Sequence, residues 1–215
     1  MLQVRSFTFN ALAEHTYVIY DETRQCAIID PGCYEPHEQA ALNQFIDQQH
    51  LQVTHLINTH AHIDHVLGNR YVIDTYQVPL ALHPADVPLL QAAGDYALQY
   101  GFPAYTPAEA TIMLTPGETI QVGHTSLAIL YVPGHSPGHI ALYSAQDNIC
   151  FSGDVLFQGS IGRTDLPGGD HATLLKSIQE QLLPLGADTV IYPGHGPATT
   201  IGAEKSNNPY LQALR

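Results

Sequence analysis

Short apolar runs dominate the chain, and they predict strands more often than helices. In the first half, the pattern predicts three strands in close succession, at residues 2–9, 15–20 and 25–30, so we expect an antiparallel start. A helix at 35–49, with apolar residues at spacings of three and four, leads into a strand at 53–57. We therefore expect a strand–helix–strand crossover after the antiparallel start.

The pattern then predicts a helix at 66–76 and a short strand at 78–82. The next segment, 84–107, is rich in Pro and Gly and carries recurring Tyr and Phe residues. It has two interpretations: it covers a pocket, or its aromatic side chains complete the core beneath a long connection.

The second half repeats the strand-rich pattern. It predicts one helix at 172–182 and strands at 111–114, 119–122, 125–132, 139–144, 148–152 and 188–192. No linker or low-complexity tract divides the 215 residues, so we predict a single domain over residues 1–215.

Charge excludes some classes of partner. The formal charge is −13, with seven Lys plus Arg, and two bound divalent ions would leave the chain strongly acidic. We therefore expect no nucleic acid and no membrane as partner.

The N-terminal residues lack the apolar core of a signal peptide, which predicts a cytoplasmic protein. Three Cys residues without a C-x-x-C pair predict free thiols, and Cys33 is expected to be packed.

Candidate metal ligands crowd into one stretch, Thr59-His60-Ala61-His62-Ile63-Asp64-His65, directly after the strand at 53–57. Any one of these residues alone could be a turn or cap residue. Together they would repel and desolvate one another without a cation. We expect a loop in which His60 and His62 bind one ion while Asp64 and His65 turn towards a second.

Three later strands also end in a candidate ligand, and these ligands are His135, Asp154 and His195. Groups just past several strand ends can converge at one edge of a sheet. The resulting set has imidazole and carboxylate but no thiolate, which suits zinc, iron or manganese. It is too large for one tetrahedral ion and fits two ions that share a bridge, which favours catalysis over a closed structural site.

The series T-H-A-H-I-D-H, P-G-H-S-P-G-H, S-G-D and P-G-H-G, in this order, resembles the metallo-β-lactamase superfamily. Two stretches are most similar to the glyoxalase II (hydroxyacylglutathione hydrolase) group, particularly its short bacterial members: Gly153-Asp154 followed by Gly159-Ser160-Ile161-Gly162-Arg163-Thr164-Asp165, and Pro193-Gly194-His195-Gly196-Pro197. This resemblance implies an α/β protein with an αβ/βα four-layer sandwich: two mixed sheets face to face, helices outside, and metals at one edge.

The resemblance also implies the ligand assignment. His60, His62 and His135 would hold the first metal, Asp64, His65 and His195 the second, and Asp154 would bridge them. The β-lactamases of the superfamily lack an Asp bridge at this position, so a β-lactam substrate is disfavoured.

The implied activity is hydrolysis of a small-molecule acyl thioester, such as S-D-lactoylglutathione, by a hydroxide bridging two divalent metal ions, expected to be zinc with iron or manganese as alternatives. Asp64 is the expected catalytic residue, because it can both bind a metal and orient the hydroxide. Arg163 is expected to bind the substrate, with an ion pair to Asp165 as the alternative role. The segment after His195 is too short for the C-terminal helical domain of full-length glyoxalase II, so the thiol carrier is left open.

Alternatives stay open at this point. A persulfide dioxygenase would bind a single iron through two His and one Asp, and a lactonase or other ester hydrolase would use the same two metals. A metal-binding protein without catalysis is a further class. His139 is expected to support its loop by hydrogen bonding. The oligomeric state is not predicted.

Overall fold

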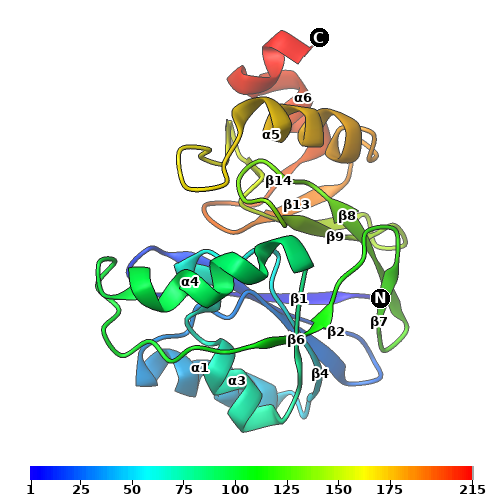
Figure 1. Ribbon diagram of the computed structural model, residues 1–215. Coiled ribbons are helices and arrows are strands. Elements are labelled where there is room, and N and C mark those ends of the chain that lie inside the picture. Colours follow the sequence, from blue (N-terminus) through cyan, green and yellow to red (C-terminus); the bar gives the residue numbers. More distant parts are fainter. Residues whose placement is uncertain (215) are drawn as a thin grey trace. The chain divides into compact units, whose positions relative to one another are not determined.

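The computed structural model describes residues 1–214, and these fold as two compact units (Figure 1). The first unit contains residues 1–114 and 121–125, and the second contains residues 115–120 and 126 onward. This division does not test the expectation of one domain over residues 1–215, which stays a prediction. The two units are described separately below.

A mixed sheet forms the base of the first unit. Its strands are β1 (Gln3–Phe9), β2 (Glu14–Tyr20), β3 (Gln25–Ile29), β4 (Gln52–Ile57), β5 (Leu80–Leu82) and β6 (Ala110–Met113). They lie in the order of the sequence. β1, β2 and β3 pair antiparallel, whereas β3 to β6 pair parallel. The predicted antiparallel start and the crossover after it are confirmed.

The helices of the first unit bury their apolar side chains in one core. They are α1 (Pro36–Gln48), α2 (Ile63–Val66), α3 (Asn69–Tyr76), the 3-10 helix η1 (Pro84–Asp86) and α4 (Val87–Ala97). Leu42 of α1 and Leu90 of α4 belong to the same buried cluster as Leu56 of β4, so both helices contribute to the core of this unit (Figure 1). The Glu38 carboxylate accepts the backbone N–H of Glu35 at 2.9 Å and closes the first turn of α1.

The predicted helix at 66–76 is present as α3 but begins only at Asn69, and the separate helix α2 precedes it. The break lies at Gly68, whose N–H donates to the carbonyl of Pro31 at 2.7 Å. A Cβ at Gly68 would lie 2.5 Å from Sγ of Cys33, so the close approach needs glycine. Because α2 begins at Ile63, Asp64 and His65 are helical residues and not part of the expected loop.

The aromatic segment 84–107 contributes to the core of the first unit. Phe102 is buried and packs edge-on against Tyr34, with 5.1 Å between the ring centroids. The Tyr34 hydroxyl accepts the backbone N–H of Ala104 at 2.8 Å, and Tyr105 packs against the same core. The interpretation that these aromatic residues complete the core is confirmed for Phe102 and Tyr105.

A second mixed sheet has most of its residues in the second unit. Its order is β14 (Thr199–Thr200), β13 (Val190–Pro193), β10 (Ile149–Gly153), β9 (Ile140–Ser144), β8 (Thr125–Tyr131) and β7 (Thr119–Val122). The β10–β13 pair is parallel, and the pairs β13–β14, β9–β10 and β8–β9 are antiparallel. The small hairpin of β11 (Leu156–Phe157) and β12 (Ser160–Ile161) follows β10.

The helices of the second unit are α5 (His171–Ser177), the π-helical turns η2 (Ile178–Leu182), α6 (Ile201–Asn207) and the 3-10 helix η3 (Pro209–Leu214). Leu174 of α5, Leu182 of η2 and Ile201 of α6 share one core with Ile191 of β13. The predicted helix at 172–182 is therefore present as α5 continued by η2. The strands β11, β12 and β14 and the last two helices were not predicted, because such short elements have too few residues for a periodic pattern.

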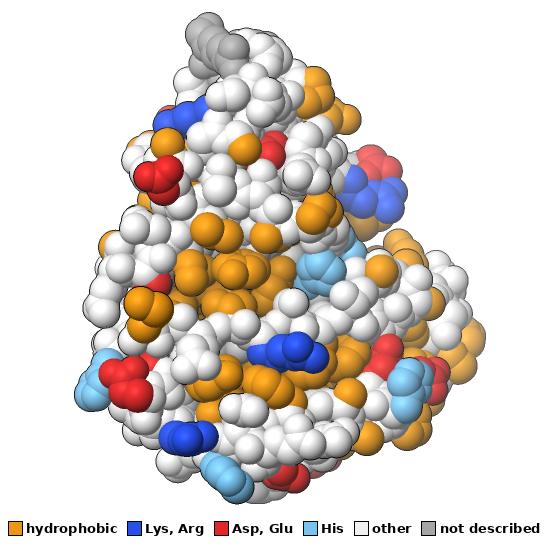
Figure 2. Space-filling view, turned by 180° about the vertical axis from the view of Figure 1, so that it is seen from behind, with side chains coloured by type: hydrophobic (Ala, Val, Ile, Leu, Met, Phe, Trp, Pro, Cys, Tyr) orange, Lys and Arg blue, Asp and Glu red, His pale blue; other side chains and the backbone are white. Residues whose placement is uncertain are grey.

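The surface fits the acidic composition. On the face shown in Figure 2, Lys and Arg side chains lie scattered singly. A helix both long enough and apolar enough to span a bilayer does not occur within residues 1–214.

All three cysteines, Cys26, Cys33 and Cys150, are buried free thiols, which confirms the expectation for Cys33.

Candidate metal centre

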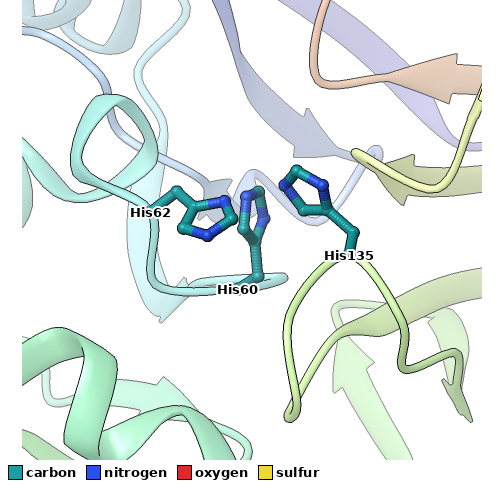
Figure 3. Close-up of side chains that lie close together, drawn as sticks. All are labelled: His60, His62 and His135. Atoms are coloured by element: carbon teal, nitrogen blue, oxygen red, sulfur yellow. The ribbon is translucent and has the colours of Figure 1, made fainter. Parts of the chain in front are cut away.

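In the first unit, four predicted ligands lie between the end of β4 and the end of α2. His60 and His62 are on the loop before α2, with ring planes 88° apart and centroids 4.9 Å apart (Figure 3). The rings of His60 and His65 are closer still, at 4.1 Å. Nε2 of His65 lies 3.6 Å from Oδ2 of Asp64. Crowded imidazoles and a carboxylate at these separations can share a cation.

Asp30, at the end of β3, supports this stretch. Its two carboxylate oxygens accept the N–H of Thr59 at 2.7 Å and the Oγ1 hydroxyl of Thr59 at 2.6 Å. Oδ2 of Asp30 also lies 3.2 Å from Nδ1 of His65, which leaves Nε2 of His65 as the atom available to a metal. Ligand atoms of Asp30, His60 and His65 all lie within 4.8 Å of one another.

A second buried carboxylate, Glu14 of β2, lies behind the same histidine. Its Oε1 is 3.9 Å from Nδ1 of His65, and Thr16 donates its hydroxyl to Oε2 at 3.1 Å. Burial raises the pKa of Glu14 well above its ordinary value, although the nearby His65 opposes this shift. A Cβ at Gly32 would lie 2.0 Å from Oε2 of Glu14, so the chain can pass this carboxylate only with glycine there.

The sequence singled out neither Glu14 nor Asp30 as a residue of the site. Glu14 is the first residue of β2 and Asp30 directly follows β3, and an acidic residue at a strand end is a common surface pattern. Glu14 is followed by His15 and Thr16, so no local pattern in the sequence marks it as buried.

In the second unit, three strand ends carry His135, Asp154 and His195, as predicted. His135 follows β8 (Figure 3), Asp154 follows β10 and His195 follows β13. Oδ2 of Asp154 lies 3.6 Å from Nε2 of His135 and 3.5 Å from Nε2 of His195. The second unit thus places one carboxylate oxygen beside two histidine nitrogens, which is what a bridging ligand needs.

The orientation of these ligands depends on their neighbours. Nδ1 of His135 donates to the carbonyl of Arg163 at 2.7 Å, so its Nε2 is the atom left for a metal. A Cβ at Gly162 would lie 1.9 Å from the carbonyl oxygen of Asp154 and 3.2 Å from Nδ1 of His135. The loop that carries Gly162 and Arg163 therefore packs directly against two of the predicted ligands.

His139 is buried beside the same loop. Its Nε2 accepts the backbone N–H of Asp154 at 3.0 Å, and its Nδ1 donates to the carbonyl of Ile140 at 3.0 Å. Because a carbonyl can only accept, the hydrogen sits on Nδ1 and the ring is the neutral tautomer. The predicted supporting role of His139 by hydrogen bonding is confirmed.

Arg163 forms the ion pair that was its alternative role. Its Nε and Nη2 donate to the two carboxylate oxygens of Asp165, each at 2.7 Å, and both side chains are exposed. These hydrogen bonds lower the pKa of Asp165 to about 2. The pair holds the guanidinium on the surface of the ligand loop, and a role in substrate binding stays a proposal.

A family model described as the metallo-β-lactamase superfamily matches residues 10–195. The chain therefore belongs to this superfamily of metal-dependent hydrolases. Among its relatives, the hydroxyacylglutathione hydrolase GloC of Haemophilus influenzae is 36% identical over 216 residues, which cover 99% of both chains.

Two solved structures share the fold over nearly the whole chain. The B3 metallo-β-lactamase BLEG-1 has a TM-score of 0.90 and 36% identity, covering 98% of this chain and 100% of that one. TTHA1623 in a di-iron-bound form has a TM-score of 0.87 and 38% identity, covering 97% and 100%. With two mixed sheets and their helices, these matches confirm the predicted fold class and the recognised superfamily.

Proposed function

We propose that this protein is a binuclear metal-dependent thioester hydrolase of the glyoxalase II type, acting on S-D-lactoylglutathione or a similar acyl thioester. The observation that carries the proposal is the position of Asp154. Its Oδ2 lies within 3.6 Å of Nε2 of both His135 and His195, the two histidines that the resemblance assigns to different metals. A bridging carboxylate is typical of two-metal hydrolases.

The residues fit two divalent ions. The first metal would be held by His60, His62 and His135, the second by Asp64, His65 and His195, with Asp154 between them. Oxygen atoms near Nδ1 of both histidines support this fit, Oδ2 of Asp30 at 3.2 Å from His65 and the Arg163 carbonyl at 2.7 Å from His135, because metal-binding imidazoles usually donate their other N–H to oxygen. Zinc is the proposed metal, and the di-iron form of TTHA1623 keeps iron as an alternative.

When bound, the ions would supply a hydroxide nucleophile at neutral pH and polarise the substrate carbonyl. The proposed catalytic residue of the chain is Asp64. Its carboxylate accepts a hydrogen bond from the attacking water and so orients a lone pair towards the carbonyl carbon. Arg163 is proposed to donate hydrogen bonds to the carboxylate of the thiol carrier, which requires its guanidinium to turn partly away from Asp165.

A thioester substrate is supported by the similarity to GloC, which is named as a hydroxyacylglutathione hydrolase and matches over almost its whole length. The formal charge of −13, with seven Lys plus Arg, supports a small-molecule substrate over a nucleic acid or an anionic membrane. We further propose a cytoplasmic location, in keeping with the free thiols.

The test is turnover of S-D-lactoylglutathione by metal-quantified protein, followed by loss of thioester absorbance. We expect two metals per chain and a kcat/KM of roughly 10⁴ M⁻¹s⁻¹ or more. Asp64→Asn should lower kcat by about 10²- to 10⁴-fold. The matched control is Asp74→Asn on α3, an exposed residue paired with Arg70, which should leave kcat unchanged. Equal activity of wild type and Asp64→Asn would reject this site.

A β-lactam is the second candidate substrate, because the BLEG-1 structure, named as a B3 metallo-β-lactamase, is 36% identical. The Asp bridge disfavours it. Hydrolysis of a cephalosporin with no thioester turnover would select that candidate. A single bound iron, with oxygen consumed on glutathione persulfide, would select the dioxygenase, and lactone turnover alone would select a lactonase.

A further inference from the structure

The peptide between His60 and His62 is held by a residue that the proposed chemistry does not use. Oδ2 of Asp86 accepts the backbone N–H of Ala61 at 3.0 Å. Asp86 and Ala61 are both buried. Asp86 lies at the end of η1, on a different element from the histidines. Its carboxylate therefore contacts the main chain of the ligand loop from outside that loop.

The turn that carries Asp86 is itself fixed. Nδ1 of His83 accepts the N–H of Ala85 at 3.3 Å, and the N–H of Asp86 donates to the carbonyl of His83 at 3.0 Å. η1 follows β5 directly, and β5 pairs with β4, the strand that leads into the ligand loop. The sheet thus sets the distance between Asp86 and Ala61.

A second and separate set of side chains holds the other pair of ligands in the first unit. Nδ2 of Asn10 donates to the carbonyl of Asp64 at 3.1 Å. Nδ2 of Asn58 donates to the carbonyl of His65 at 3.0 Å, and Asn69 donates to Oδ1 of Asn58 at 2.7 Å. These contacts reach the backbone of Asp64 and His65 and not the His60–His62 peptide.

We propose that Asp86 is a positioning residue for the metal bound by His60 and His62, and that Asn10 and Asn58 position the ligands of the other metal. The proposal rests on the binuclear function above. Rotation of the Ala61 peptide would swing both neighbouring imidazoles, so one hydrogen bond to its N–H controls two ligands at once. Outer partners of this kind typically contribute about 10- to 100-fold to metal affinity.

The experiment measures Co²⁺ binding to metal-stripped protein, from its visible absorption and by competition with a chromophoric chelator. Asp86→Ala should weaken one of two Co²⁺ ions by roughly 10- to 100-fold and leave the other near wild type. Asn10→Gly, chosen because residue 10 has a positive φ of 51°, should also weaken one ion. If Asp86 and Asn10 act on different metals, the double variant Asp86→Ala/Asn10→Gly should bind no Co²⁺ ion tightly.

Two conservative variants separate geometry from charge. Asp86→Asn keeps an acceptor oxygen at the same place but loses the charge, whereas Asp86→Glu keeps the charge and moves the oxygen by one methylene. A positioning role predicts tighter Co²⁺ binding in Asp86→Asn than in Asp86→Glu. The reverse order would overturn the proposal, and this pair decides the question even if Asp86→Ala does not fold.

The matched control is Asp21→Ala, also in the first unit. Asp21 is buried and accepts the backbone N–H of Thr23 at 2.9 Å and of His124 at 2.6 Å, but it does not contact the ligand loop through these bonds. The Asp21→Ala variant should have a lower free energy of unfolding and unchanged affinities for both Co²⁺ ions. Equal loss of Co²⁺ affinity in Asp21→Ala and Asp86→Ala, or a double variant with one tight ion, would overturn the proposal.

A failure of the proposed function and a failure of the positioning role of Asp86 give different results. Wild-type protein that binds two Co²⁺ ions but hydrolyses no thioester would refute the proposed function and leave the role of Asp86 intact. Normal thioester turnover together with unchanged Co²⁺ binding in the Asp86 variants would refute only the positioning role.

Discussion

The backbone N–H of Asp154 donates to Nε2 of His139 at 3.0 Å. His139→Phe would fill a similar volume and leave this buried N–H without its acceptor. We expect the free energy of unfolding to fall by about 1–3 kcal/mol, the usual cost of an unsatisfied buried group. Urea unfolding measures it, with His171→Phe, at an exposed position of α5, as the control. Equal midpoints for the two variants would contradict the structural role of His139.

Gly162 is expected to tolerate no side chain. In Gly162→Ala the new Cβ would meet the carbonyl oxygen of Asp154 at 1.9 Å, so the backbone that carries a predicted ligand must move. We expect the free energy of unfolding to fall by roughly 3 kcal/mol. Gly186→Ala is the control, because its Cβ would find its nearest neighbour, Oγ1 of Thr189, only at 3.8 Å. Thermal unfolding of both variants compares them, and similar losses would argue against the close contact.

Glu204 should be a strong stability determinant of the second unit. It is buried and accepts three hydrogen bonds: the Thr199 hydroxyl at 2.6 Å, the Gly159 N–H at 2.8 Å and Nδ2 of Asn208 at 2.8 Å. Glu204→Ala removes all three, and we expect unfolding to become easier by roughly 3 kcal/mol. Glu180→Ala, at an exposed position, should change stability by less than about 0.5 kcal/mol in the same urea series.

The three cysteines should be unreactive in the folded protein. Burial raises the pKa of Cys26 and of Cys150 to about 12 and raises the pKa of Cys33 further. Because the thiolate is the reactive form, Ellman's reagent at pH 8 should label none of them until urea unfolds the chain. Rapid labelling of one thiol under native conditions would show that its surroundings open easily.

Asp21 should contribute to acid sensitivity. Burial by itself would raise its pKa, but hydrogen bonds from Thr23 and from the backbone of His124 lower the pKa below its ordinary value. A lowered folded pKa gives stability that is present above about pH 4 and lost as the pH falls through the folded value. Urea midpoints between pH 5 and pH 2 should therefore fall less steeply in Asp21→Asn. Parallel curves for variant and wild type would contradict this assignment.

Much of the fold could be predicted from the local pattern of apolar and polar residues. The antiparallel start, the crossover through α1 and the strands that precede His60, His135, Asp154 and His195 follow from apolar runs bounded by turn residues. Errors occurred where the pattern is too short or is overruled by packing. The break between α2 and α3 depends on the approach of Gly68 to Cys33, which residues 66–76 alone do not reveal.

The sequence by itself determined which donors the protein has: imidazoles and carboxylates, without thiolate, placed after apolar strands, and the family that this order identifies. Only the tertiary structure decided which side chains hold those donors in place. Asp30, Asp86 and His139 lie far along the chain from the groups they contact, or in turns of ordinary composition. Hydrogen bonding acts over about 3 Å in space and leaves no periodic trace in the sequence. Such partners therefore become visible only when the chain is folded.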